Sequence, residues 1–251
     1  MTTNVHSLLG PYWSAPLGGR ARNCKDFLVD SYTLQEQNPP QVIPLTLHQA
    51  RSRGKDADSA LNQAKNRTDI PSAAAVKHKT IASMRLITQP TRWNSGQDRS
   101  SIRTPGKEGT PVELTGFLIR IKPGSAESCN CELTRRVDTD VHLVLTKETD
   151  DAEETSVTAE ITPRIRANGH PDWLFKNVND LEGDFIRVTG WLMLDTKHIR
   201  QSHLLPTETR FNKGLKRATN WEVHPVTKLE VCQKSVSACK AGQGWEEFSV
   251  P

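Results

Sequence analysis

The sequence has no long hydrophobic run. None of its apolar stretches approaches the roughly 18 residues that a membrane-spanning helix requires. Its beginning, MTTNVHSLLGPYWSAP, also lacks the charged and then apolar pattern of a secretory signal. These absences argue against a membrane partner, and we expect a soluble protein located in the cytoplasm.

Cysteines are few and unevenly placed. The chain has five, an odd number, at positions 24, 129, 131, 232 and 239. Because a chain of 251 residues can fold around a hydrophobic core without disulfide cross-links, we expect reduced thiols. Cys129 and Cys131 are closer together than the cysteines of a usual zinc knuckle, and no second pair stands at a matching spacing. A zinc finger is therefore disfavoured.

Several familiar functional signatures are missing as well. The PLGGRAR stretch near residue 16 has neither Walker spacing nor a Rossmann context. No serine stands in a G-x-S-x-G pattern, and no run matches the aromatic signature of an RRM. The sequence thus gives no support for a P-loop nucleotide hydrolase, an esterase-type nucleophile or an RRM.

Positive charge is concentrated in the first part of the chain. Residues 1–110 contain 15 Lys and Arg against 8 Asp and Glu, whereas residues 111–251 contain 18 against 21. The first part is also interrupted by prolines and glycines, which predicts a long, irregular, partly ordered segment. One helix is expected near Asp58 to Lys65, capped by Asp58 or Ser59. Such a basic arm could hold phosphates, or it could be a solvated extension.

Residues 111–232 show the pattern of a barrel. Runs in which aliphatic and polar residues alternate predict five strands, at 112–121, 140–145, 156–162, 184–195 and 220–231. Between the third and the fourth, Leu174, Val178 and Leu181 lie along one helical face, with Pro171 and Asp172 suited to the start of a helix and Gly183 to its end.

Three strands, one helix and two strands is the chain order of the OB barrel. We therefore expect a mainly β protein with a five-stranded, antiparallel OB-like barrel, followed by a tail at 233–251. A generic antiparallel sandwich is the alternative. In OB barrels the loop joining strands four and five commonly borders the ligand site, and here that loop is long.

Alternation predicts which side chains share a face. In the second, third and fifth strands the aliphatic face is backed by a polar one carrying Asp140 and His142, Glu160, and Glu222 and His224. Asp195 and His198 end the fourth strand. If these imidazoles and carboxylates converge, they form a mixed set of nitrogen and oxygen donors for a divalent transition metal, or an acid-base pair. Polar outward faces with ordinary cross-strand pairs are the alternative.

Several short segments resemble an uncharacterised bacterial family of OB-like domains. That family is marked by D-x-H, E-x-T-P, G-W-L followed by D-x-x-H, and W-E-x-H-P-V. The resemblance covers residues 112–232. It implies an OB-like fold and the choice of site residues, and it names no reaction. The segments that carry it are ESCNC (127–131), DTDVHLVL (138–145), AEITPR (159–164), VTGWLMLDTKH (188–198) and RATNWEVHPVTKLEV (217–231).

Two functions from different classes follow. The first is a module that binds single-stranded nucleic acid or another anionic ligand, through stacking aromatics and the cations of the loop between strands four and five. Its candidate residues are Trp191, Arg200, Arg210, Phe211, Lys213, Lys216 and Arg217.

The second is a metal-dependent hydrolase of the phosphodiesterase or nuclease type. A metal ion would activate water, and Glu160 or Glu222 would act as the base. Its candidate metal ligands are Asp140, His142, His198 and His224. The sequence does not decide whether the protein is an enzyme.

Overall fold

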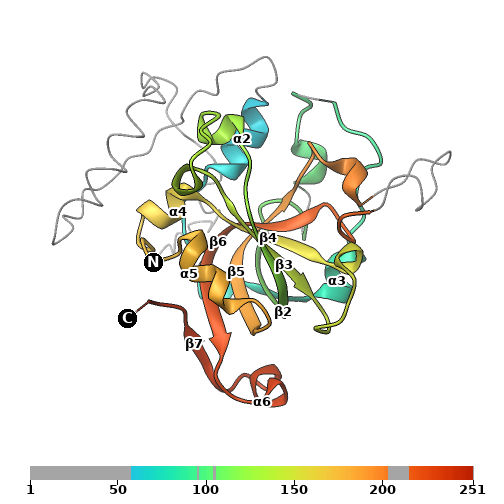
Figure 1. Cartoon of the computed structure of the whole chain (residues 1–251). Helices are drawn as coiled ribbons and strands as arrows, with labels where there is room; N and C mark the ends of the chain where they lie inside the picture. The colour runs from blue at the N-terminus through green and yellow to red at the C-terminus, as the bar shows by residue number, and fades with distance from the viewer. Residues whose placement is uncertain (1–57, 95, 104–105, 203–214, 251) are drawn as a thin grey trace, which may run out of the picture.

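The computed structural model describes residues 58–94, 96–103, 106–202 and 215–250. Within these ranges the protein is mainly β, and five strands close into a barrel (Figure 1). The barrel strands are β2 (Pro111–Pro123), β3 (Val141–Thr146), β4 (Val157–Ile161), β5 (Phe185–Leu194) and β6 (Trp221–Cys232). The five strands expected from the alternating pattern are confirmed, each within two residues of its expected bounds.

The order of the strands around the barrel is β2, β3, β4, β6, β5 and back to β2. Neighbouring strands are antiparallel except β4 and β6, which run parallel with Ala159 opposite Val223. The expectation of a wholly antiparallel barrel is thus wrong for one pair. Strand direction cannot alternate all the way round a closed ring with an odd number of strands, so one neighbouring pair must be parallel. The chain order is that of the OB-like barrel.

The segment between β4 and β5 differs in detail from the single helix expected there. It contains α4 (Pro163–Ala167), α5 (Phe175–Val178) and the 3₁₀ turn η6 (Asn179–Leu181). The second helix begins at Phe175 and not at Pro171, because Leu174 before it has an extended backbone. The side chain of Trp173 is completely buried and donates a 3.1 Å hydrogen bond from Nε1 to the carbonyl of Phe248. The segment does not form one continuous helix, because the extended backbone here places the Trp173 ring in the core.

The described residues before the barrel pack against it. The helix expected near Asp58 is confirmed as α2 (Ser59–Lys65), and the Asp58 side chain caps it by accepting a 3.0 Å hydrogen bond from the Leu61 amide. Strand β1 (Lys77–Thr80) pairs in parallel with β2, and α3 (Ile81–Arg85) follows it. Ile81 and Met84 join the barrel core, so this segment shares one core with residues 111–232.

Short 3₁₀ turns occupy several of the connections. They are η1 (Ala73–Ala75), η2 (Ser100–Ile102), η3 (Ser128–Asn130), η4 (Arg136–Asp138), η5 (Glu153–Thr155) and η7 (Ile199–Gln201). Both η3 and η4 belong to the loop that joins β2 to β3, and η7 opens the loop that joins β5 to β6. These two loops are the ones that border the ligand site in OB barrels.

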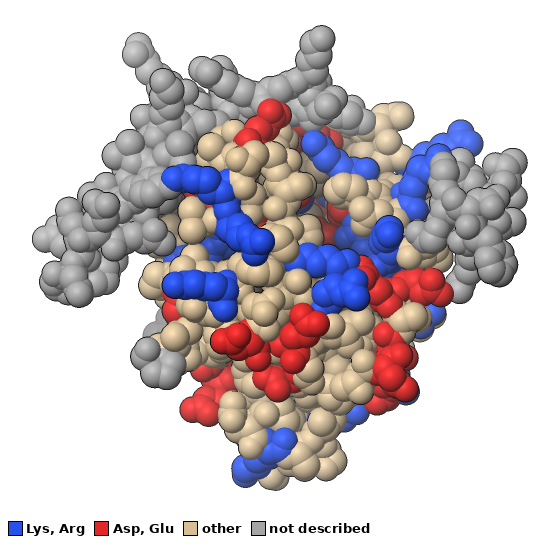
Figure 2. Space-filling model, in the orientation of Figure 1, with Lys and Arg blue, Asp and Glu red and all other residues tan. Residues whose placement is uncertain are grey.

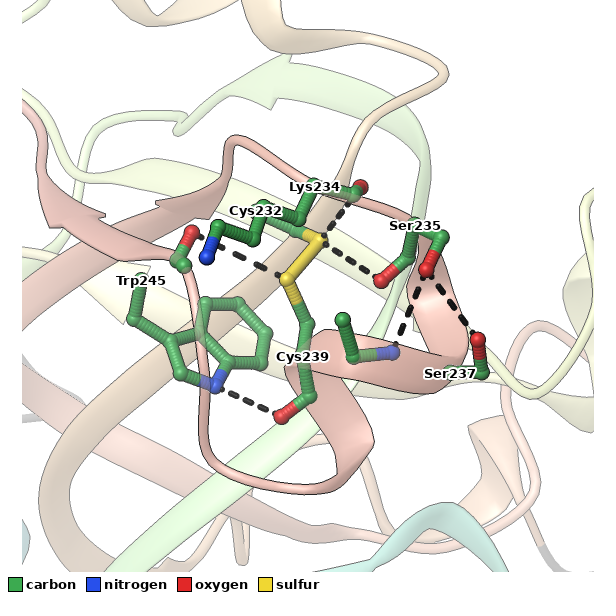
Figure 3. Close-up of a disulfide and its surroundings, with 8 residues drawn as sticks. Cys232, Lys234, Ser235, Ser237, Cys239 and Trp245 are labelled. Carbon is green, nitrogen blue, oxygen red and sulfur yellow. Dashed lines mark hydrogen bonds between the residues drawn. A yellow bond between two sulfur atoms is a disulfide. The ribbon is translucent and has the colours of Figure 1, made fainter.

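The end of the chain forms a small cross-linked hairpin. Helix α6 (Val236–Lys240) is followed by β7 (Trp245–Glu247), which pairs with β6. A disulfide joins Cys232 to Cys239, and Trp245 donates a 2.8 Å hydrogen bond from Nε1 to the Cys239 carbonyl (Figure 3). Cys131 is also disulfide-bonded, and among the described cysteines Cys129 is free. The expectation of reduced thiols is therefore wrong for three cysteines. Since disulfides persist in oxidising compartments, the cysteines no longer support a cytoplasmic location.

The barrel interior holds the aliphatic faces that alternation predicted. Leu143 and Leu145 of β3, Ala159 of β4 and Val223 of β6 are completely buried in one core cluster. Trp221 is also buried there, and its Nε1 donates a hydrogen bond to the carbonyl of Thr88. No helix in the described ranges is long and apolar enough to span a lipid bilayer.

Candidate functional site

Polar side chains gather on the outer face of three neighbouring strands. His142 of β3 lies directly opposite Glu160 of β4. Because Ala159 pairs with Val223 in the parallel β4 and β6 ladder, the next residues, Glu160 and His224, also lie side by side. These side chains point away from the aliphatic core, as period-two alternation requires.

This outer face is covered by two other parts of the chain. Helix α2 lies over it, with Leu61 and Ala64 packed on Met193 of β5. The η3 turn lies beside α2 (Figure 1), and Ser128 of that turn donates a 3.1 Å hydrogen bond to Oδ1 of Asn62. The polar face of the barrel therefore becomes a buried layer, in which Asp140, Glu160 and His224 are at most 3% exposed.

Three of these buried side chains converge. One donor atom from each of Asp140, Glu160 and His224 lies within 4.8 Å of the other two. Within the described ranges, Oδ2 of Asp140 and Nε2 of His224 have no hydrogen-bond partner, whereas Nδ1 of His224 and Oε2 of Glu160 form an ion pair with each other at 2.8 Å. Buried polar atoms normally have such partners, so this convergence needs an explanation.

Asp140 is held in place by a chain of hydrogen bonds. Asn130 donates from Nδ2 to Oδ1 of Asp140 at 3.0 Å, and Arg164 donates from Nη1 to Oδ1 of Asn130 at 3.1 Å. Arg164 is fixed in turn by a 2.8 Å hydrogen bond to the Cys129 carbonyl. One carboxylate oxygen of Asp140 is thus used for orientation, and the other remains for the site.

His224 lies between two carboxylates. Its Nδ1 is 2.8 Å from Oε2 of Glu160 and 3.4 Å from Oε1 of Glu222. Burial alone would lower the pKa of His224, but the two carboxylates raise it to about 10. Burial would raise the pKa of Glu160, but His142, Lys65 and His224 together hold it well below its usual value. The buried centre therefore contains a positively charged imidazole ring and a negatively charged carboxylate in direct contact.

Lys65 is the residue of this centre that sequence reasoning missed. Its Nζ lies 2.6 Å from Oε2 of Glu127 and 3.7 Å from Oε2 of Glu160. Burial acts to lower its pKa, but the surrounding carboxylates raise it well above the usual value, which keeps the ammonium charged. Glu127 and Cys129 were missed too. The sequence offers no signal for their convergence with Lys65, because the contact joins segments far apart in the chain.

A second polar cluster adjoins the first through Glu222. Arg217 donates a 2.9 Å hydrogen bond from Nη1 to Oε2 of Glu222, and its Nη2 contacts Asp195. His198 contacts the same oxygen of Asp195, with Nδ1 2.8 Å from Oδ2. His198 is therefore not one of the residues whose donor atoms converge with Asp140. His142 is adjacent to that group, with Nε2 3.5 Å from Oε1 of Glu160.

The described residues among those expected to hold an anionic ligand have different environments. Arg217 is buried and is not exposed on the loop as expected. Its guanidinium forms ion pairs with the buried carboxylates of Asp195 and Glu222. Trp191 is covered by the guanidinium of Arg67, 3.3 Å from its ring centroid, and donates a hydrogen bond to the Asp69 carbonyl. Arg200 and Lys216 are exposed. The remaining three expected residues, Arg210, Phe211 and Lys213, lie outside the described residues.

Comparison with known proteins gives little further information. No family model and no curated protein matches the chain, so the resemblance to an uncharacterised OB-like family stays a prediction. Among solved structures, asparaginyl-tRNA synthetase of Entamoeba histolytica is similar at 14% identity and a TM-score of 0.31, over 66% of this chain and 26% of the synthetase. The same enzyme with asparaginyl-adenylate gives 17% identity and a TM-score of 0.28, over 52% and 23%. The chain thus matches about a quarter of the synthetase's length.

Proposed function

We propose that this protein is an OB-like binding domain that holds one divalent transition-metal ion on Asp140, Glu160 and His224. The observation that carries the proposal is the convergence of three buried donor residues, in which Oδ2 of Asp140 and Nε2 of His224 have no hydrogen-bond partner among the described residues. A bound cation would satisfy these atoms and offset the cost of burying the carboxylate charges, and His224 would release a ring proton to solvent when it coordinates.

The donor set and its spacing suit such an ion. One imidazole and two carboxylates form a mixed nitrogen and oxygen set that binds zinc, manganese or iron. Metal to donor bonds of about 2.1 Å place donor atoms at most about 4.2 Å apart. The observed limit of 4.8 Å therefore needs only small movements of the side chains. The hydrogen bond from Asn130 supplies the outer support that metal-binding carboxylates usually have.

Burial favours metal binding over hydrolysis. Glu160 and Glu222, the candidate bases, are 3% and 0% exposed beneath the segments that cover them. Catalytic metal sites keep an open coordination position for water or substrate, whereas structural sites are closed. A hydrolytic role would require α2 to leave the face, so the proposal is limited to metal binding.

Metal titration tests this proposal. Chelator-treated protein should bind one equivalent of Zn²⁺ or Co²⁺ in calorimetry, and its melting temperature should rise, since a ligand at 100 times its Kd adds about 2.7 kcal/mol of stability. Asp140→Asn and His224→Gln should lose this binding. The matched control His78→Gln changes an exposed histidine and should retain it.

The result can go against the proposal in two ways. Wild-type protein that binds neither ion would overturn it, whatever the variants do. It would also fail if the two folded variants bound the metal as tightly as wild type, with folding checked by circular dichroism.

Anion binding is a second candidate function, and it concerns the surface. Arg200 and Lys216 are both exposed in the loop between β5 and β6, and the Lys216 amide donates a 2.8 Å hydrogen bond to the Gln201 carbonyl, which brings the two segments together. Figure 2 shows Lys and Arg side chains across the middle and upper part of the visible face, with most acidic side chains below them. In OB barrels this loop borders the site for single-stranded nucleic acid.

Oligonucleotide titration tests the second function. If single-stranded DNA binds, its affinity should fall steeply with salt, and the double variant Arg200→Ala/Lys216→Ala should reduce the slope by about 0.7 for each phosphate that the variant no longer neutralises. Lys240→Ala, an exposed lysine of α6, is the control. An absence of binding at low salt would remove this candidate and leave the metal proposal untouched.

A further inference from the structure

The ammonium group of Lys65 lies in the middle of the buried centre. It is 2.6 Å from Oε2 of Glu127, which is the distance of a strong charge-assisted hydrogen bond, and 3.7 Å from Oε2 of Glu160. Lys65 reaches this position from the last turn of α2, and the side chain is 6% exposed. A buried lysine in contact with two carboxylates acts there as a fixed cation.

A second group of three potential ligands adjoins the same ammonium through Glu127. Donor atoms of Glu127, Cys129 and Asp140 lie within 4.8 Å of one another, and Sγ of Cys129 is 3.2 Å from Oε2 of Glu127. This group shares Asp140 with the group formed by Asp140, Glu160 and His224. Two ligand groups joined by one carboxylate are the arrangement of a two-metal centre, in which the ions lie about 3.5–4 Å apart.

A second observation points to a ligand beside Asp140, the residue that the two groups share. Oδ2 of Asp140 is buried and has no hydrogen-bond partner within the described ranges, although Oδ1 is satisfied by Asn130. Glu127 and Cys129, in contrast, already have partners, because Oε2 of Glu127 accepts from both Lys65 and Cys129. In the second group, the partners of Glu127 are therefore Lys65 and Cys129, and the atom left without a hydrogen-bond partner is Oδ2 of Asp140, which both groups share.

We propose that Lys65 takes the place of a metal ion in the second group, so that it limits the centre to one metal ion. This inference rests on the proposed function, since it assumes an ion on Asp140, Glu160 and His224. A divalent ion in the second group would compete with the ammonium for Oε2 of Glu127 and would be repelled by it at short range. Lys65 is thus the residue that sets the metal stoichiometry.

The second group has a distinct chemistry that makes it detectable. It contains a thiol, whereas the first group contains nitrogen and oxygen donors, and thiolate favours softer ions such as Zn²⁺. On binding a metal ion, the Cys129 thiol would release its proton to solvent and coordinate as thiolate. A Co²⁺ ion with a thiolate ligand shows a strong near-ultraviolet charge-transfer band that oxygen and imidazole ligands do not give.

Titration with Co²⁺ tests the inference. Wild type should bind one equivalent without the thiolate band. Lys65→Met keeps the length of the side chain and removes its charge, and it should bind two equivalents with the band. Lys65→Met/Cys129→Ser should lose the band, and Lys65→Arg, which retains a cation, should behave like wild type.

The outcomes separate this inference from the proposed function. Wild type that binds no Co²⁺ overturns the proposed function, and with it this inference. Wild type that binds one ion, with a folded Lys65→Met variant that also binds one and shows no band, overturns the inference alone. If Lys65→Met does not fold, the wild-type spectrum decides, because a thiolate band there would show that Lys65 does not keep metal from Cys129.

Discussion

Arg217 donates a 2.9 Å hydrogen bond to the carboxylate of Glu222, although both side chains are buried. The other guanidinium nitrogen contacts Asp195 at the end of β5. One cation thereby compensates two buried carboxylates, and it ties the segment before β6 to the end of β5. This contact also supports the proposed metal site indirectly, because Glu222 lies beside His224.

Replacing Arg217 with methionine should destabilise the protein strongly. The change leaves Asp195 and Glu222 buried without their counter-charge, and breaking a buried pair from one side costs roughly 3–5 kcal/mol. Urea unfolding of metal-free protein measures the effect. The control Lys216→Met changes an exposed lysine next to Arg217 and should alter stability by less than about 0.5 kcal/mol. Equal stability of the two variants would contradict the structural role of Arg217.

The contact between Asp195 and His198 should make stability depend on pH. Burial would raise the pKa of Asp195, but His198 and Arg217 hold it well below its usual 3.8, so its contribution is present above about pH 4 and is lost in acid. The hydrogen bond that His198 donates to Asp195 raises the pKa of His198 above its usual 6.5, despite partial burial. That contribution is complete below pH 6.5 and is lost as the pH rises through the folded-state pKa.

The pair should therefore stabilise the fold most between about pH 4 and pH 6.5. Urea unfolding of wild type and His198→Asn at pH 5 and pH 9 measures this dependence. The loss of stability caused by the substitution should be larger at pH 5. His78→Asn, in an exposed histidine, corrects for general effects of pH. A loss of the same size at both pH values would refute the assignment.

Gly190 should not tolerate a side chain. It lies at the register shift between β5 and β6, and a Cβ there would overlap the carbonyl oxygen of Pro225 and lie 2.9 Å from Cγ1 of Val223. Gly190→Ala should lower the free energy of unfolding, measured in urea, by about 3 kcal/mol. This value is at the upper end for overpacked sites, because the added Cβ would overlap a backbone atom, which cannot move aside as a side chain can. It should also weaken metal binding, since Pro225 follows His224. Thr189→Ala is the neighbouring control, and a Gly190→Ala variant as stable as that control would disprove the close approach.

The disulfide between Cys232 and Cys239 should add a modest stability. Closing a loop with a sequence separation of 7 contributes about 2 kcal/mol through the entropy of the unfolded chain. Cys232→Ser/Cys239→Ser should lose this amount in urea unfolding without reductant, whereas Ser237→Ala inside the same loop should change little. Mass measurement of alkylated, unfolded wild type should show Cys129 labelled and both Cys232 and Cys239 protected. Labelling of Cys232 and Cys239 would mean that this disulfide does not form.

Much of the barrel follows from local pattern. Alternation in VHLVLT of β3 and in VTAEI of β4 predicts both the strands and the residues that face the core, because one buried face requires period two. The Asp58 cap predicts the start of α2 in the same way. The gathering of His142, Glu160 and His224 on the opposite face follows from that alternation together with the OB strand order.

The expectations that were wrong concern contacts between distant segments, which local pattern does not contain. Trp173 interrupts the expected helix because a buried core position outweighs helical periodicity. Local pattern predicts that Arg217 is a cation of an exposed loop. The two buried carboxylates that pair with it belong to other segments of the chain. The cysteine number does not reveal which thiols meet in space.

The amino-acid sequence by itself determined the strands, their inward and outward faces, and the presence of imidazole and carboxylate groups on the outer one. Tertiary structure alone decided that this outer face is buried, because α2 and the η3 turn pack over it and bring Lys65, Glu127 and Cys129 to Glu160 and Asp140. Local periodicity depends on neighbouring residues of one segment, whereas the environment of a charge depends on every segment that packs against it.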